Sequence, residues 1–357
     1  MFPRNSRNRG CRISDAWAYR GLRTLVMEND LVRVVVLLDQ GSDIICFEYK
    51  PLGLDLLWNA PSGGVLSPGQ HITSRPLAEG NFADFHEGGW QECFPNGGRV
   101  CTYRGTEFGL HGEVFGLPWA CEIVADSAEE VAARLTVRTR RTPFVLEKTL
   151  RLRDGLALLE IEETVRNEGR HPMEFMWGHH PAFGEPFLSG ACVVTTGAKT
   201  AVLHDGDDPE SRFSRPLKGA PASLTSRSGA TVNALRVPAR DEVVSDMLYL
   251  TDLDEGFYAL TNTGLGIGFA MEFDPCVFSC IWYWIACNAP GGAPFHGRSY
   301  AVALEPFTSW PAILTNAIAN GTQRNLGPGE ALSTRLTAGV FASHEPPATA
   351  RQISYHR

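Results

Sequence analysis

A glutamate near the C-terminal end of the chain lies where a carboxylate could act as a base. Glu305 follows the apolar run 301–304 and precedes Pro306, so we expect it at the end of a strand, on the rim of an apolar wall. Burial there would raise the pKa of the carboxyl group and make it a better base near neutral pH. Most glutamates of a β-rich protein are structural, so a catalytic role for Glu305 requires a partner.

Two histidine segments could supply that partner. His111 stands two residues before Glu113, and these two side chains would share a face of an extended backbone. His179 and His180 are adjacent, within the segment 177–183. Because neighbouring side chains of a strand point to opposite faces, only one of the two can enter a given pocket, and the other is expected to be structural.

Two further clusters could bind a polar ligand. The segment 88–98 gathers Glu92 and Asn96 among four glycines and a proline, which is typical of a loop that presents hydrogen-bonding side chains. Trp282 and Trp284 are two residues apart and would share a face of a strand. Such a pair could stack on a sugar ring, although packing in a core is its commoner role.

Other chemistries find less support in the sequence. A cupin-like metal site would use closely spaced histidines, but His-x-His is absent and an adjacent His-His pair is a poor substitute. There is no Gly-x-Ser-x-Gly segment for a nucleophilic serine and no Gly-x-x-x-x-Gly-Lys loop for phosphates.

The composition of the 357-residue chain is that of an ordinary globular protein, with 43% hydrophobic and 20% charged residues. A net charge of −8 and a pI of about 5.7 argue against nucleic acid as a partner. No apolar run approaches the roughly 18 residues of a membrane span. No two of the nine cysteines have the Cys-x-x-Cys spacing, which predicts reduced thiols in a cytoplasmic protein.

The pattern of hydrophobic residues predicts an all-β protein, a large antiparallel β-sandwich. The clearest hairpin is Leu146–Val165, in which apolar and charged residues alternate on both sides of the turn Asp154-Gly155. Ser127–Ala133 is expected to be a turn between strands, and no segment carries a sustained helical stripe. Further strands are expected at Val32–Leu38, Ile44–Tyr49, Met247–Thr251, Phe257–Thr261, Gly266–Phe273, Val277–Ile285, Ser299–Leu304 and Ser333–Phe341.

The ends of the chain are expected to lie outside this sandwich. Residues 1–20 are rich in arginine, with no apolar segment behind the charges, and are predicted to be a poorly ordered basic tail rather than a signal peptide. Residues 21–345 are predicted to form a single β-sandwich domain, and residues 346–357 a C-terminal tail.

Taken in order, these segments resemble the galactose mutarotase (aldose 1-epimerase) superfamily, nearly from end to end. Residues 110–112 resemble its first histidine motif, and 178–183 resemble its Asn-His-x-Tyr-Phe segment, with His180 on the catalytic histidine. Residues 303–306 match its Leu-Glu-Pro motif and 326–330 its Leu-x-Pro-Gly-Glu turn.

The sequence also departs from that pattern, as a divergent subfamily would. Phe307 stands where the family has a glutamine, and Ala182 where it has a tyrosine. The arginine that usually precedes the first histidine motif has no clear counterpart. These changes affect the identity of the sugar more than the chemistry.

The resemblance implies an isomerase that interconverts the α and β anomers of a free sugar by acid–base ring opening, without cofactor or metal. It implies Glu305 as the base that takes the proton of the anomeric hydroxyl and His180 as the acid that protonates the ring oxygen. The implied substrate-binding residues are His111, Glu92, Asn96, Glu113, Trp284 and, less firmly, Trp282.

Two alternatives stay open. One is another epimerase or lyase reaction on the same scaffold, although a net charge of −8 disfavours polyanionic substrates and sugar phosphates. The other is a non-catalytic carbohydrate-binding or sugar-sensing protein, which would need stacking aromatic residues but no acid–base pair. In either case the expected partner is a small sugar, and the sequence leaves a homodimer open. A structure discriminates, because Glu305 and His180 should face one another across a cleft that holds a pyranose.

Overall fold

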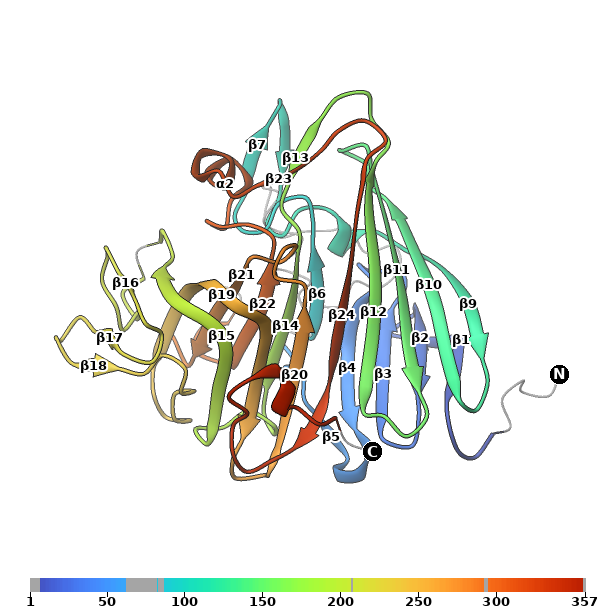
Figure 1. Cartoon of the computed structure of the whole chain (residues 1–357), viewed down its shortest axis with the longest axis horizontal. Helices are drawn as coiled ribbons and strands as arrows, with labels where there is room; N and C mark the ends of the chain where they lie inside the picture. Colours follow the sequence, from blue (N-terminus) through green and yellow to red (C-terminus); the bar gives the residue numbers. More distant parts are fainter. Residues whose placement is uncertain (1–6, 62–81, 83–86, 207, 292–294, 356–357) are drawn as a thin grey trace.

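The computed structural model describes residues 7–61, 82, 87–206, 208–291 and 295–355. Strands dominate the fold, and every pair of named strands in this part of the chain is antiparallel (Figure 1). The all-β prediction is therefore confirmed. Eighteen strands form one continuous hydrogen-bonded sheet that folds over on itself to enclose the core.

The first half of this sheet carries the strands that matter for the site. In spatial order its strands are β1 (Arg12–Tyr19), β2 (Leu22–Glu28), β3 (Val32–Leu37), β4 (Asp43–Tyr49), β6 (Trp90–Cys93), β14 (Gly178–Gly184), β22 (Tyr300–Phe307), β21 (Cys280–Cys287), β19 (Val244–Asn262) and β15 (Cys192–Leu203). Two short strands extend its edges, β5 (Leu54–Asp55) beside β4 and β16 (Lys218–Gly219) beside β15.

The second half continues from the far end of β19. Its order is β20 (Ile267–Phe273), β24 (Ala331–Ala342), β12 (Leu158–Asn167), β11 (Phe144–Arg153), β10 (Glu130–Arg138) and β9 (Ala120–Asp126). The nineteen-residue β19 belongs to both halves, because residues 244–250 pair with β21 and residues 257–262 pair with β20. Between them the backbone turns at Asp252, whose φ is 57°.

Smaller elements complete the described chain. Three separate two-stranded ladders are β7 (Cys101–Tyr103) with β8 (Thr106–Phe108), β13 (Met173–Phe175) with β23 (Arg324–Leu326), and β17 (Leu224–Thr225) with β18 (Thr231–Val232). The helical elements are α2 (Leu314–Asn320) and the 3-10 turns Lys50–Leu52, Val114–Gly116 and Ala350–Gln352. Among the described helices, none is long and apolar enough to span a membrane.

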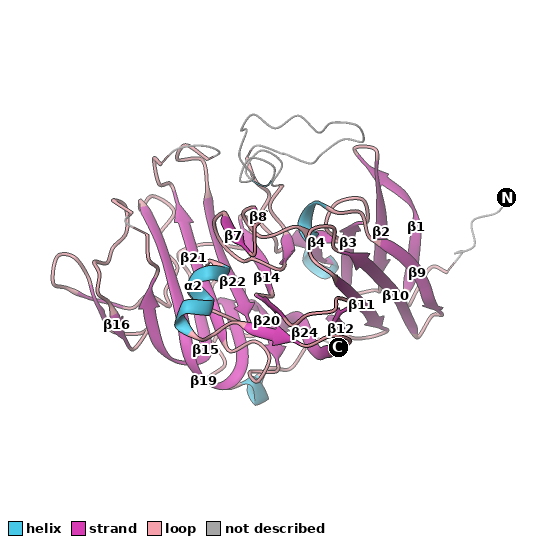
Figure 2. Ribbon diagram, turned by 90° about the horizontal axis from the view of Figure 1, so that it is seen from above, coloured by secondary structure: helices cyan, strands magenta, loops and turns pink. Residues whose placement is uncertain are grey.

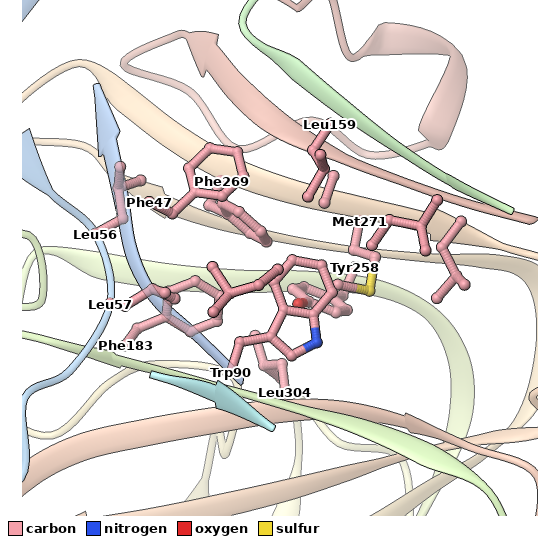
Figure 3. Packing of buried hydrophobic residues seen from close by; sticks show 14 of the residues in the cluster. Phe47, Leu56, Leu57, Trp90, Leu159, Phe183, Tyr258, Phe269, Met271 and Leu304 are labelled. Carbon is pink, nitrogen blue, oxygen red and sulfur yellow. The ribbon is translucent and has the colours of Figure 1, made fainter. Parts of the chain in front are cut away.

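Large apolar side chains of both halves fill the space between them (Figure 3). The rings of Phe47 on β4 and Phe269 on β20 meet edge to face with their centroids 5.4 Å apart. Trp90 and Phe183 pack against the same Phe269 ring. Burying side chains of this kind is worth roughly 1.5–3 kcal/mol each, so this core holds the site strands in place.

The predicted hairpin is confirmed as β11 and β12, and all the other predicted strands overlap observed ones. Two of them, 247–251 and 257–261, are parts of the single strand β19, and the strand predicted from Val277 begins only at Cys280. The predicted turn at 127–133 is confined to its first residues, since β10 begins at Glu130. All nine cysteines are free thiols.

The chain ends are more structured than the sequence predicts. Within the expected tail 1–20, residues 12–19 form β1, because their backbone pairs with β2. Within 346–357, Tyr355 bridges to Phe341 and its hydroxyl donates to Glu272 Oε1 at 2.8 Å. The assignment of 21–345 to a single domain stays a prediction. Figure 2 places β15, β16 and β19 at one end of the molecule and β1 and β9 at the other.

Candidate active site

Neighbouring strands of the first half-sheet place polar and aromatic side chains in one row. The register sets Gln91 on β6 opposite His180 on β14, and Trp282 on β21 opposite Glu305 on β22. Pairing of 178 with 307 and 182 with 303 sets His180 opposite Glu305, and Tyr249 on β19 is opposite Trp282. Residues directly opposite one another point to the same face, so the row spans five strands on one face.

The other face of the same strands packs into the core. His179 is opposite Glu92 on β6, and both side chains point inward, as alternation along a strand requires. His179 Nδ1 accepts a hydrogen bond from Trp90 Nε1 at 3.1 Å, and its Nε2 lies 3.0 Å from Glu163 Oε2. Of the two adjacent histidines, His180 is therefore the one on the face of Glu305.

His180 and Glu305 form a close, buried pair on neighbouring strands, so they contact one another directly instead of facing one another across a cleft as predicted. His180 Nε2 lies 3.5 Å from Glu305 Oε1, and the two residues are 7% and 1% exposed. Glu305 Oε2 has no hydrogen-bond partner among the described residues. Burial raises the pKa of Glu305 well above its ordinary value and lowers the pKa of His180 to about 4. Both shifts favour the uncharged pair, in which Glu305 is a carboxylic acid and His180 is a neutral imidazole.

The pair opens on a cavity of about 350 Å³, a volume that accommodates a sugar. One part of its wall is apolar and largely aromatic, formed by Phe82, Leu110, Leu203, Met247, Trp282, Trp284, Phe295 and Ala312. The remaining wall is polar and comprises Gly98, Arg99, His111, His180, His204, Gly206, Asp208, Ser211, Ser245, Asp246 and Glu305. A lining that combines aromatic rings with polar groups can bind the apolar face and the hydroxyl groups of a sugar ring.

His111 joins this pair from a strained loop. Its backbone is left-handed, with a φ of 60°, and its N–H donates to the carbonyl of Gly97 at 3.1 Å. The imidazole lies edge-on to His180, with ring centroids 5.1 Å apart, and to Phe82, at 4.3 Å. Non-glycine residues rarely adopt this conformation, and those that do cluster at functional sites.

The two tryptophans contribute differently to the cavity. Trp282 is fully buried, stacks on Phe307 with ring centroids 3.6 Å apart, and donates from Nε1 to the carbonyl of Ser309. Trp284 is only half-buried, and its ring centroid lies 6.0 Å from that of His180. Trp284 is therefore the better placed of the two to stack on a ligand.

Three predicted substrate-binding residues are not among the cavity-lining residues, and their role as ligands stays a prediction. Glu92 is an ion-pair partner of Lys148, with Nζ 2.9 Å from Oε2, and accepts from Trp177 Nε1. Asn96 braces its own loop by donating to the carbonyls of Gly98, Arg99 and Gly109. Glu113 accepts from the backbone of Arg140 and Arg141 and from the hydroxyl of Thr142.

Other residues of the cavity escape the sequence analysis. Arg99 follows the glycine pair 97–98 and lines the cavity, although no arginine motif precedes His111 in the sequence. His204 follows directly after β15 and belongs to no motif. Asp246 lies on β19, where its carboxylate accepts from Ser211 Oγ and Arg212 Nε. Among the described residues, no three His, Cys, Asp or Glu side chains could hold a metal ion together.

The fold is that of the galactose mutarotase-like proteins. A structure from Klebsiella pneumoniae subsp. pneumoniae described as a putative aldose 1-epimerase matches with a TM-score of 0.74 at 17% identity, over 94% of this chain and 84% of that one. A galactose mutarotase-like protein from Clostridium acetobutylicum matches with a TM-score of 0.63 at 14% identity, over 93% and 99% of the two chains.

The chain belongs to the family DUF4432, a domain of unknown function, whose model matches residues 19–340. None of the curated proteins matches the sequence significantly. The identities to the solved structures are low, so the likeness to them defines the fold and the chemistry must be argued from the site.

Proposed function

We propose that this protein is an aldose 1-epimerase-like enzyme that interconverts the α and β anomers of a free sugar. The observation that carries the proposal is the His180–Glu305 pair, 3.5 Å apart, buried and facing a cavity, with one carboxylate oxygen unpartnered among the described residues. The cavity beside this buried carboxyl group supports a catalytic use over a structural one.

The reaction needs one group to take a proton and another to give one. Glu305 takes the proton from the anomeric O1 hydroxyl while His180 delivers a proton to the ring oxygen, and the C1–O5 bond breaks to give the open-chain aldehyde. Rotation about C1–C2 presents the other face of the carbonyl. Ring closure then returns both protons, so the pair ends as it began. Each group contributes on the order of 10²- to 10⁴-fold.

The protonation state of the pair is compatible with these roles. The uncharged pair and the carboxylate–imidazolium pair have the same number of protons and differ only in the position of one, which lies on Glu305 in the first and on His180 in the second. A sugar hydroxyl that donates to Glu305 stabilises the carboxylate, so that the proton moves to His180 when the substrate binds. His111 is close enough to His180 to bind the same part of the sugar, and Trp284 offers a ring for its apolar face.

The test is anomer exchange measured by NMR saturation transfer over a panel of free hexoses, uronic acids and modified hexoses. The wild type should accelerate exchange of at least one sugar, and Glu305→Gln and His180→Asn should each lower kcat by about 10²- to 10⁴-fold. Glu345→Gln, which changes an exposed glutamate away from the cavity, is the matched control and should retain full activity.

The alternatives give different results in the same experiment. Sugar binding without acceleration for any member of the panel would contradict the proposal and favour a carbohydrate-binding or sugar-sensing protein. A change at a carbon other than C1, seen as a new sugar in the spectrum, would indicate another epimerase reaction on this scaffold.

A further inference from the structure

Two nitrogen donors converge at the end of the cavity remote from Glu305. A Cβ atom built on Gly206 would lie 3.5 Å from His204 Nε2 and 3.8 Å from Arg99 Nη2. Gly206 has no such atom, so both nitrogens border the same small space. All three residues line the cavity described above.

Tyr249 holds His204 in place. The hydroxyl oxygen of Tyr249 accepts from the backbone N–H of Ala312 at 2.8 Å and lies 2.5 Å from His204 Nδ1. When the hydroxyl donates to Nδ1, a neutral His204 carries its own proton on Nε2. Burial and the positive charges of Arg99 and Arg215 lower the pKa of His204, against the opposing effect of Asp205. In this neutral tautomer, His204 presents an N–H donor at Nε2.

Arg99 is available as a second donor. No described residue forms a hydrogen bond or an ion pair with its guanidinium, and the residue is exposed and lines the cavity. A guanidinium offers several N–H groups in one plane and no acceptor. The space above Gly206 is therefore bordered by donors on both sides.

The acidic residues of this end are engaged elsewhere. Asp208 accepts from the N–H of Glu210 and from Ser245 Oγ, and Asp246 accepts from Ser211 and Arg212. Their hydrogen-bonding capacity is largely used, but the charges of Asp205 and Asp208 remain close. They oppose any anion, and a dianion such as a phosphate ester about twice as strongly as a monoanion, so a single negative charge is the better match for Arg99.

We propose that Arg99 and His204 bind a carboxylate of the substrate, and that the sugar is a hexuronic acid or a close relative of one. This inference rests on the proposed function and names the substrate class of the same site. A carboxylate has two oxygens in one plane, carries one charge and accepts hydrogen bonds only, which matches the two donors. Although the net charge of the chain is negative, the Arg99 guanidinium acts on a bound carboxylate at much shorter range than the distant charges do.

The catalytic pair and the two donors line one cavity. Four strands lie side by side in the order β22, β21, β19, β15, so the backbones at Glu305 and at the end of β15 are about 14 Å apart at a spacing of roughly 4.8 Å per strand, and the side chains must cover part of this span. Side chains enter the cavity from both ends of this span. In a hexuronic acid the carboxylate is attached to C5, across the ring oxygen from C1, so the catalytic pair and the donors can engage one ring.

The experiment compares anomer exchange of glucuronate and galacturonate with that of glucose, galactose and glucose 6-phosphate. We expect kcat/KM for a uronate to exceed that for its parent hexose by about 10- to 100-fold, the worth of a charged hydrogen bond. Arg99→Gln should bring this ratio close to one. Gly206→Ala, which fills the space between the donors, should lower the ratio in the same direction. Arg170→Gln removes an exposed arginine away from the cavity and should leave the ratio unchanged.

Failure of the inference differs from failure of the proposed function. Acceleration of the neutral hexoses with no preference for uronates, or a preference for glucose 6-phosphate, would overturn the inference and leave the mutarotase proposal standing. If no sugar is accelerated, uronate binding is measured by isothermal titration calorimetry. Binding weakened about 10-fold or more by Arg99→Gln would support the inference without the catalysis, and no uronate binding would overturn it.

Discussion

Two histidine–glutamate pairs lie on opposite faces of the single strand β14. On the core face, His179 Nε2 is 3.0 Å from Glu163 and its Nδ1 accepts from Trp90, so both ring nitrogens are held by the protein. On the cavity face, His180 Nε2 is 3.5 Å from Glu305, whose second oxygen has no partner among the described residues. Adjacent histidines of one strand are thus each paired with a glutamate, one in the core and the other at the cavity.

The difference shows what separates a structural pair from a catalytic candidate. The core pair spans the two halves of the sheet, from β14 to β12, and both ring nitrogens of its histidine have protein partners, although Glu163 Oε1, like Glu305 Oε2, has none among the described residues. The cavity pair joins two neighbouring strands and leaves hydrogen-bonding capacity beside about 350 Å³ of space. Burial is nearly equal, and each pair has one carboxylate oxygen without a partner among the described residues, so it is the cavity that marks the site.

Exchanging each histidine separately is the strongest test of this comparison. His180→Asn should lower kcat for mutarotation by about 10²- to 10⁴-fold with little change in folding, because the acid is lost. His179→Asn should lower the free energy of unfolding by about 1–3 kcal/mol for each of the two polar partners that it strands, Trp90 and Glu163. NMR saturation transfer and urea unfolding measure the two effects.

An inactive, stable His179→Asn protein, or a destabilised His180→Asn protein with full activity per folded molecule, would reverse the assignment of the two faces. Activity must be scaled to the folded fraction, which near-UV circular dichroism reports.

The second prediction concerns Glu92, which lies on the core face beside His179. Although burial acts to raise it, the pKa of Glu92 is lowered by Lys148, His179 and Trp177. Glu92→Gln should therefore cost about 3–5 kcal/mol in urea unfolding, because it leaves the Lys148 ammonium buried without its counter-ion. Sugar binding by the folded fraction should be unaffected.

Glu122→Gln is the matched control for that measurement. Its ion pair with Arg134 is exposed, so its loss should cost less than about 1 kcal/mol. Loss of sugar affinity in Glu92→Gln at unchanged stability would show that Glu92 binds the sugar and does not act as a structural ion-pair partner.

Alternation predicts strands well only where one face of the sheet meets solvent. β11 and β12 have a buried and a more exposed face, and their hairpin follows from the sequence. β14 and β22 are buried along their whole length, because one face packs on the core and the other lines the cavity. Their polarity therefore does not show which of His179 and His180 faces the site, and only the motif spacing indicated His180.

The sequence finds the residues of the site that belong to motifs and misses those brought in by long-range pairing. Glu305, His180 and His111 lie in recognisable segments, and the structure brings the three side chains to one cavity. His204 depends on Tyr249, 45 residues away, through the pairing of β15 with β19. The ion pair of Glu92 cannot be seen in the sequence for the same reason, since its partner Lys148 is 56 residues away.

The third prediction separates the two tryptophans on the cavity face. Trp284→Leu should raise KM about 2- to 10-fold with kcat little changed, which corresponds to the roughly 0.5–1.5 kcal/mol of an aromatic stacking contact. Trp282→Leu should mainly lower stability, because that ring is stacked on Phe307 and fully buried. Steady-state anomer exchange and urea unfolding check the two variants, and a larger effect of Trp282→Leu on KM would assign the platform to Trp282.

The smallest expected effect is a gain in stability from losing the proposed base. The pKa of Glu305 is raised in the folded protein by burial, so as pH rises above its unfolded pKa, about 4.5, the folded state keeps a proton that the unfolded state loses. This group therefore destabilises the wild type progressively as pH rises above that value. Glu305→Gln removes the effect and should unfold in urea with a free energy about 1 kcal/mol higher at pH 7.5, with a smaller difference near pH 4.5.

Glu163→Gln is the counterpart on the core face and should have the opposite sign. It weakens the acceptor of His179 Nε2 and should lower the free energy of unfolding at both pH values. If Glu305→Gln were as destabilising as Glu163→Gln, Glu305 would be a structural partner of His180. The contrast between the two faces of β14 would then lose its physical basis, because a carboxyl group held for catalysis should cost stability where a carboxyl group held for folding contributes it.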